Sequence, residues 1–133
     1  MKKILVIHNR YQITGGEDIA VTNEVALLKK YYEVRTVYFD NTLKNFLLQV
    51  LSFLTNSNSQ SYHRIEKELI EFEPDFAYVH NTWFKASLSV FKALKKHNIK
   101  IILKLHNFRY NCSFTYSLNT HLNNKKICLA CGL

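Results

Sequence analysis

Glycine, proline and long apolar runs are scarce in this chain. Only three glycines and one proline occur among 133 residues, so asparagine and serine must form most of the turns. No stretch approaches the roughly 18 apolar residues of a membrane-spanning helix, and the apolar run behind Met1-Lys2-Lys3 is too short for a secretion signal. We therefore expect a cytoplasmic protein whose cysteines are reduced.

Carboxylates are missing from the second half of the chain. Residues 1–75 hold nine of the 18 Lys and Arg and all ten Asp and Glu, so the whole positive excess behind the overall net charge of +8 arises after Asp75. Such a segment suits an anionic partner, which could be nucleic acid, anionic lipid, a phosphorylated substrate or an acidic second domain. The alternative is that several lysines only form the solvent-facing side of a helix, namely Lys85, Lys92, Lys95 and Lys96.

Apolar patterning predicts one domain of alternating strands and helices. Continuous apolar runs predict strands at residues 4–8, 34–38, 76–79 and 99–105. Apolar residues at helical spacing predict helices near 17–31, 43–54, 65–72 and 84–94. This order is typical of a parallel sheet whose strands are buried on both faces. We expect a Rossmann-like α/β fold over residues 1–133, with a cysteine-containing segment at 107–133.

The same dipeptide follows three of the predicted strands. His8-Asn9, His80-Asn81 and His106-Asn107 each stand at the end of an apolar run. Ligands of open α/β sheets bind outside the carboxyl ends of the strands, so these side chains should open onto one crevice. Imidazole and amide groups can hydrogen-bond sugar hydroxyls or diphosphates. Trp83 adds a surface for sugar stacking, although it is equally suited to a core.

Gly15 and Gly16 lie between the first predicted strand and helix. Without β-carbons they allow a phosphate or sugar to approach the helix N-terminus, where Glu17 and Asp18 suit the positive end of the dipole. The pair is a weak motif, because neither G-x-G-x-x-G nor G-x-x-x-x-G-K-[ST] is present. A plain turn is the alternative.

The cysteines form a second constellation. Cys128 and Cys131 are spaced as C-x-x-C, with Cys112 sixteen residues upstream of the pair. A zinc site would need a fourth ligand, which His106 or His121 could supply. The spacing matches no standard zinc motif, so the pattern favours buried reduced thiols over a metal site or a redox pair.

Four segments together resemble a known family. They are Lys3-Ile4-Leu5-Val6-Ile7-His8-Asn9, the turn Thr14-Gly15-Gly16-Glu17-Asp18, the run Pro74-Asp75-Phe76-Ala77-Tyr78-Val79-His80-Asn81-Thr82, and Leu105-His106-Asn107-Phe108-Arg109-Tyr110-Asn111-Cys112. Their order and spacing resemble the N-terminal domain of family 4 glycosyltransferases, which have the two-domain GT-B architecture. A subgroup of that family carries cysteines at places similar to Cys112, Cys128 and Cys131.

The resemblance implies retaining transfer of a sugar from a nucleotide-sugar to a cell-surface glycan or lipid-linked acceptor, with no cofactor. It assigns Gly15, Gly16 and Glu17 to the donor loop and His106 to the donor sugar as the catalytic residue. His80 and Asn81 would line the acceptor side, Asn107 and Arg109 would belong to the same cleft, and His8-Asn9 would have the smallest role, as a strand end. Catalysis would depend on the leaving diphosphate and on electrostatic stabilisation rather than on a protein nucleophile.

The sequence departs from the family because the nucleotide-binding C-terminal domain, with its Glu-x7-Glu signature, is absent. We therefore expect an incomplete acceptor-side domain that is inactive alone, needs the missing domain as its partner, and has a basic half that could meet the inner face of an anionic membrane. The alternative function is a non-catalytic basic α/β module that binds nucleic acid or protein. Nucleic acid is the less favoured partner, because no nucleic-acid fold signature is found.

Overall fold

The computed structural model describes residues 1–10, 15–40, 58–80, 82 and 86–105. Its elements are β1 (Lys3–Arg10), α1 (Gly16–Leu28), β2 (Glu33–Asp40), α3 (Ser59–Phe72), β3 (Phe76–Val79), α4 (Ser89–Lys96) and β4 (Lys100–Leu103). The strands form one all-parallel sheet in the order β2-β1-β3-β4. This confirms the Rossmann-like α/β class, while the predicted helix at 43–54 and the segment 107–133 lie outside the described residues.

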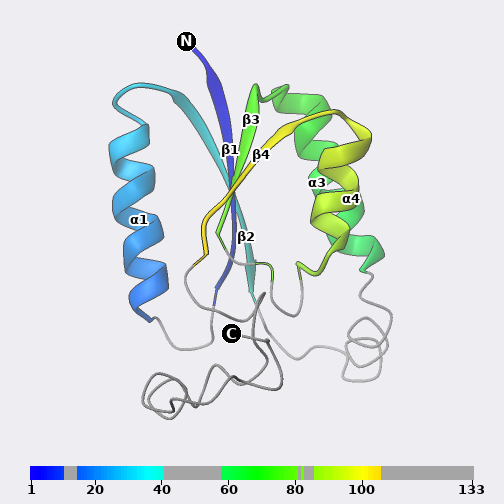
Figure 1. Ribbon diagram of the computed structural model, residues 1–133, viewed down its shortest axis with the longest axis horizontal. Coiled ribbons are helices and arrows are strands. Elements are labelled where there is room, and N and C mark those ends of the chain that lie inside the picture. The colour runs from blue at the N-terminus through cyan, green and yellow to red at the C-terminus, as the bar shows by residue number, and fades with distance from the viewer. Residues whose placement is uncertain (11–14, 41–57, 81, 83–85, 106–133) are drawn as a thin grey trace, which may run out of the picture.

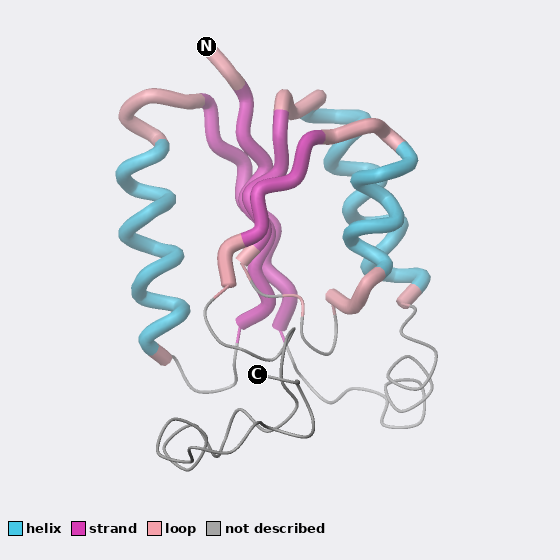
Figure 2. The backbone as a smooth tube through the Cα atoms, in the orientation of Figure 1, coloured by secondary structure: helices cyan, strands magenta, loops and turns pink. Residues whose placement is uncertain are grey.

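Helices cover both faces of the sheet. Figure 1 shows α1 on one side and α3 with α4 on the other, and Figure 2 shows the same three layers without side chains. The connection from β1 to β2 passes through α1, whereas the connection from β3 to β4 passes through α4 on the opposite face. The carboxyl ends of the strands and the N-terminal ends of the helices therefore share one edge, which is the lower edge in Figure 1.

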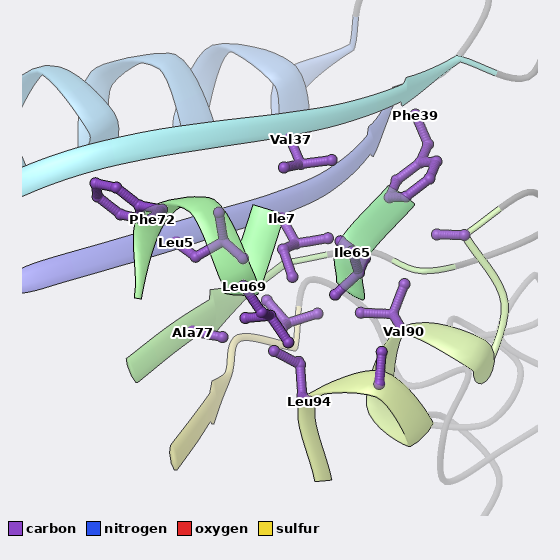
Figure 3. Close-up of a cluster of buried hydrophobic side chains, with 13 residues drawn as sticks. Leu5, Ile7, Val37, Phe39, Ile65, Leu69, Phe72, Ala77, Val90 and Leu94 are labelled. Atoms are coloured by element: carbon purple, nitrogen blue, oxygen red, sulfur yellow. The ribbon is translucent and has the colours of Figure 1, made fainter. Parts of the chain in front are cut away.

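The core consists of two clusters separated by the sheet, because alternate strand residues point to opposite faces. On the α1 face, Ile4 and Val6 pack with Val21 and Val25 of α1. On the other face, strand side chains meet α3 and α4 (Figure 3), and the members labelled there are Leu5, Ile7, Val37, Phe39, Ile65, Leu69, Phe72, Ala77, Val90 and Leu94. Residues 4–9 of β1 are buried throughout, so this strand belongs to both clusters.

Scarcity of glycine has a visible effect at three turns. Positive φ angles, which glycine adopts most easily, occur at Glu73 (49°), Ser87 (52°) and Asn98 (54°). The predicted use of serine and asparagine in turns is thus confirmed at two of these sites. Glu73 is the exception, and it ends α3 immediately before Pro74 as the sequence pattern indicates.

The strand β4 differs from expectation. Its continuous apolar run predicts a strand buried on both faces, but Ile101, Ile102 and Leu103 are 38%, 51% and 39% exposed. Within the described sheet β4 is an edge strand, paired only with β3, and α1 and α4 leave much of it uncovered. By contrast, Lys92, Lys95 and Lys96 are exposed on α4, as the solvent-facing interpretation requires.

None of the helices formed by the described residues combines the length and the apolar character needed to cross a bilayer.

Two neighbouring residues on α3 provide a direct test of the core. Leu69 is 4% exposed in the cluster of Figure 3, whereas Ile70 is 64% exposed. We expect Leu69→Ala to lower the free energy of unfolding by about 2–5 kcal/mol, because it removes buried methyl groups and leaves a cavity. Ile70→Ala should change it by less than about 0.5 kcal/mol. Urea denaturation of both variants measures the difference, and equal effects would contradict this packing.

Candidate functional site

The candidate site lies where the connections from two adjacent strands diverge. The chain leaves β1 toward α1 on one face and leaves β3 toward α4 on the opposite face, although the two strands are paired. At such a switch point an open parallel sheet forms a crevice beside the carboxyl ends of its strands. His8 and Asn9 stand at the end of β1, and His80 follows β3 with its backbone N–H 2.9 Å from the Ile7 carbonyl oxygen. All three residues are buried.

His8 is held by a carboxylate from the first turn of α1. Its Nε2 lies 2.9 Å from Oδ1 of Asp18, and Oδ2 of Asp18 accepts the backbone N–H of Gly15, also at 2.9 Å. The contact with Gly15 is the half of a capping box that an acidic side chain contributes at the third helical position. The same carboxylate therefore caps α1 and fixes the orientation of the His8 ring.

A second carboxylate, Glu24, organises the surroundings of His80. Its Oε2 accepts a hydrogen bond from the Tyr78 hydroxyl at 2.7 Å and lies 3.8 Å from Nε2 of His80. Its Oε1 accepts from the ammonium group of Lys104, which follows β4. Glu24 thus joins α1 to residues beside the ends of two strands, and it gives His80 a fixed negative neighbour.

The polar contacts of Glu24 alter the acidity of two groups. Burial raises the pKa of Glu24, but the hydrogen bonds from Lys104 and Tyr78 outweigh burial and hold that pKa below its ordinary value of 4.5. Burial, reinforced by the hydrogen bond to Glu24, raises the pKa of the Tyr78 hydroxyl above 10.0. At neutral pH the carboxylate is therefore ionised and the hydroxyl remains a donor.

Ring contacts complete the α1 side of this edge. The centroids of the His8 and His80 rings are 6.0 Å apart with nearly perpendicular planes, and those of Tyr78 and His80 are 4.3 Å apart. Tyr38, at the end of β2, packs edge-on against His8, and the Arg10 guanidinium lies 3.7 Å from the Tyr38 ring centroid. Imidazole and phenol rings thus extend across the ends of three adjacent strands.

The structure places some of the sequence-predicted site residues at this edge. Gly15, Gly16 and Glu17 lie at the start of α1, and His80 follows β3. A β-carbon added to either glycine would meet no atom of the described residues within 4 Å, and Gly15 has an extended backbone with φ of −112°. The described fold therefore does not itself require glycine at these positions, and close approach of a ligand there stays a prediction.

The other predicted residues lie outside the described part of the chain. They are Asn81, Trp83, His106, Asn107, Arg109, Cys112, His121, Cys128 and Cys131. Their roles in donor binding, stacking or zinc binding stay predictions. Among the residues that the structure does describe, no group of three or more His, Cys, Asp or Glu side chains is arranged to hold a metal ion.

Several residues of this edge make contacts that the sequence pattern does not indicate. The pattern makes His8 little more than a strand end, yet its ring contacts Asp18. The interval of three residues from Gly15 to Asp18 has the spacing of a capping box, although the residue types differ from the usual Ser or Thr and Glu or Gln. Glu24, Tyr78 and Lys104 have no comparable signal, because their contact depends on how α1 lies against β3 and on the position of β4.

Comparison of the chain with protein-family models, with curated proteins and with solved structures gives no match.

The polar contacts of Glu24 predict a specific pH dependence. Because folding lowers its pKa, the ionised carboxylate stabilises the fold above pH 4.5, and this contribution is lost as the pH falls from 4.5 through the lowered value. Urea unfolding of the wild type between about pH 7 and about pH 3 should therefore show a steeper loss of stability than unfolding of Glu24→Gln. Glu33→Gln, on the exposed start of β2, is the matched control. Parallel curves for wild type and Glu24→Gln would contradict the assignment.

Proposed function

We propose that this chain is the acceptor-side, N-terminal domain of a retaining glycosyltransferase of the family 4 type, with GT-B architecture. The observation that carries the proposal is the meeting of His8, His80 and the start of α1 at the switch point of a parallel sheet. Three of the four segments that resemble this family contribute to that edge. The proposed reaction moves a sugar from a nucleotide-sugar to a cell-surface glycan or lipid-linked acceptor.

The surroundings of the site suit binding and orientation of hydroxyl groups. His8 offers the Nδ1 atom of its imidazole ring, and Tyr38 offers an aromatic ring of the kind on which sugars pack. The carboxylates near these rings, Asp18 and Glu24, are already engaged with His8, Gly15, Tyr78 and Lys104. The proposal therefore assigns neither of them as a nucleophile and leaves His106 as the predicted contact of the donor sugar.

Ion pairing within the basic half weighs against the alternative binding module. Lys96 donates to Glu66 at 2.7 Å, and Lys104 donates to Glu24. Of the five lysines after Asp75 that the structure describes, two are thus paired with carboxylates from the first half of the chain. A nucleic-acid surface relies instead on a cluster of cations that remain available for phosphates.

Exposure of β4 supports the expectation that the described sheet is one part of a larger protein. Register places Ile101 and Leu103 opposite Ala77 and Val79, on the α3 side, while Ile102 lies opposite Tyr78 on the α1 side. Strands of all-parallel sheets are normally covered on both faces. Apolar side chains exposed on both faces of β4 therefore favour a larger protein in which further structure covers this strand.

The encoding DNA gives the first test. The proposal predicts that the reading frame continues beyond Leu133, or resumes nearby, with a second βα pattern that contains Glu-x7-Glu. A stop codon with no such sequence in the neighbourhood would contradict the proposal and leave the binding module as the better explanation.

Gly16→Ala in the protein that contains both domains tests the donor loop. The added methyl group meets no described atom within 4 Å, so the free energy of unfolding should stay the same or rise by less than about 1 kcal/mol. Transfer of radiolabelled sugar from a nucleotide-sugar to a lipid-linked acceptor should fall by roughly 100-fold, because the methyl group displaces the donor from its reactive position.

Asn23→Ala, on the exposed side of α1, is the control and should transfer sugar like the wild type. Wild-type transfer by Gly16→Ala would remove this loop from the donor site. Absence of transfer by the intact protein with any nucleotide-sugar would contradict the proposed function itself.

A further inference from the structure

Three buried polar atoms at the end of β1 have no hydrogen-bond partner within the described structure. They are both side-chain polar atoms of Asn9 and the Nδ1 atom of His8. Both residues are 0% exposed. Native proteins satisfy nearly all such groups with protein atoms, water or a ligand, so three exceptions on two consecutive residues need a cause.

Packing does not account for asparagine at this position. Alternation along β1 puts Asn9 on the same face as Leu5 and Ile7, which are fully buried in the cluster beneath α3 and α4. An apolar side chain there would avoid the desolvation penalty of a buried amide. Asn9 instead stands at the switch point between β1 and β3, where a ligand of this fold class is expected.

The contact with Asp18 determines what His8 can offer to a ligand. A carboxylate only accepts hydrogen bonds, so Nε2 of His8 must carry the proton that Asp18 Oδ1 receives at 2.9 Å. In the neutral ring Nδ1 is then an acceptor. Asn9 adds one acceptor oxygen and a donor amide. The side chains of His8 and Asn9 leave β1 on opposite faces, so one ligand meets both only where it lies across the carboxyl end of the strand. There these atoms match a ligand whose groups both donate and accept, as hydroxyl groups do.

Phosphate fits this position poorly. Asp18 places a carboxylate oxygen 2.9 Å from Nε2 of His8. An acceptor nitrogen beside a negative charge repels an anion, whereas a neutral hydroxyl can donate to it.

We infer that His8 and Asn9 form a subsite for the hydroxyl groups of a sugar, with Asp18 as the residue that positions His8. The inference rests on the proposed function, and it separates this subsite from the donor phosphates assigned to the Gly15-Gly16 loop. The sugar can be that of the acceptor glycan or that of the donor, and both share the hydroxyl chemistry that the subsite recognises.

Asn9→Leu is the first test, because leucine removes the unpartnered amide and keeps a side chain of similar size. We expect the midpoint of thermal unfolding to stay the same or rise. Saturation-transfer NMR on this chain measures binding of methyl glucoside, galactoside, mannoside or N-acetylglucosaminide. The dissociation constant should rise by roughly tenfold or more, because the variant loses a well-made hydrogen bond to the sugar. Asn23→Leu makes the same change at an exposed site of α1 and should alter neither quantity.

Several results would overturn the inference. They are a wild-type chain that binds none of the glycosides, an Asn9→Leu variant that binds them as wild type does, and an Asn9→Leu variant with a clearly lower unfolding midpoint. Inorganic phosphate and uridine diphosphate form the competing arm. The subsite would be reassigned to phosphate if either anion displaces the glycosides from the wild type and this displacement is lost in Asn9→Leu.

Asp18→Asn tests the positioning role separately. An amide has one oxygen, and the backbone N–H of Gly15 can only donate, so that oxygen must face Gly15. The NH2 group then faces Nε2 of His8, which must accept, and the ring proton moves to Nδ1. Long-range proton–nitrogen NMR of the ring at about pH 8, where imidazole is ordinarily neutral, should show the Nε2–H form in wild type and the Nδ1–H form in Asp18→Asn. An unchanged tautomer overturns the positioning role.

Failure of this inference is distinguishable from failure of the proposed function. Sugar transfer by the protein with both domains, together with unaltered glycoside binding by Asn9→Leu, would reject the subsite alone. Glycoside binding that depends on Asn9, without any transfer from a nucleotide-sugar, would reject the transferase and keep the subsite.

Discussion

Burial of β1 on both faces is the constraint on which the rest of this structure depends. The strand pairs in parallel with β2 on one side and β3 on the other, and residues 4–9 are inaccessible to solvent. Its apolar residues supply both core clusters, so helices must cover both faces of the sheet; α1 covers one face, and α3 with α4 covers the other. With helices on both faces, the connection that leaves β1 and the connection that leaves β3 run to opposite faces. Polar side chains meet at the edge of the sheet between these two connections.

The end of β1 marks the change from core to site. Residues Ile4 to Ile7 are apolar and fully buried, and the next two residues are equally buried but polar. His8 is satisfied on one side by Asp18, which also caps α1, so the stability of the helix start and the orientation of the ring depend on the same carboxylate. Asn9 has no such partner in the described structure. The end of the strand therefore holds His8, which Asp18 stabilises, beside Asn9, whose desolvation penalty is best explained by a ligand.

The sequence predicted the fold class more fully than the site. Continuous apolar runs at residues 4–8 and 76–79 correctly indicated parallel strands, because burial on both faces leaves no polar alternation. The same rule failed for β4, since an apolar run does not tell whether other elements cover the strand. The repeated His-Asn dipeptide correctly brought His8 and His80 to one edge. It could not show that Asp18 holds one ring and Glu24 neighbours the other, because those contacts are set by the position of α1 against the sheet.

Photo-crosslinking would show directly whether the carboxyl edge between β1 and β3 binds a sugar. A long-chain alkyl glycoside with a diazirine on its sugar would be irradiated with the protein, and the modified peptides would be mapped by mass spectrometry. Sugar binding at this edge would place labels on the segments that contain His8–Arg10, Gly15–Asp18 and His80, and unlabelled glycoside would compete for them. Labels confined to the exposed surfaces of α3, α4 and β4, or labels that free glycoside does not compete away, would contradict it.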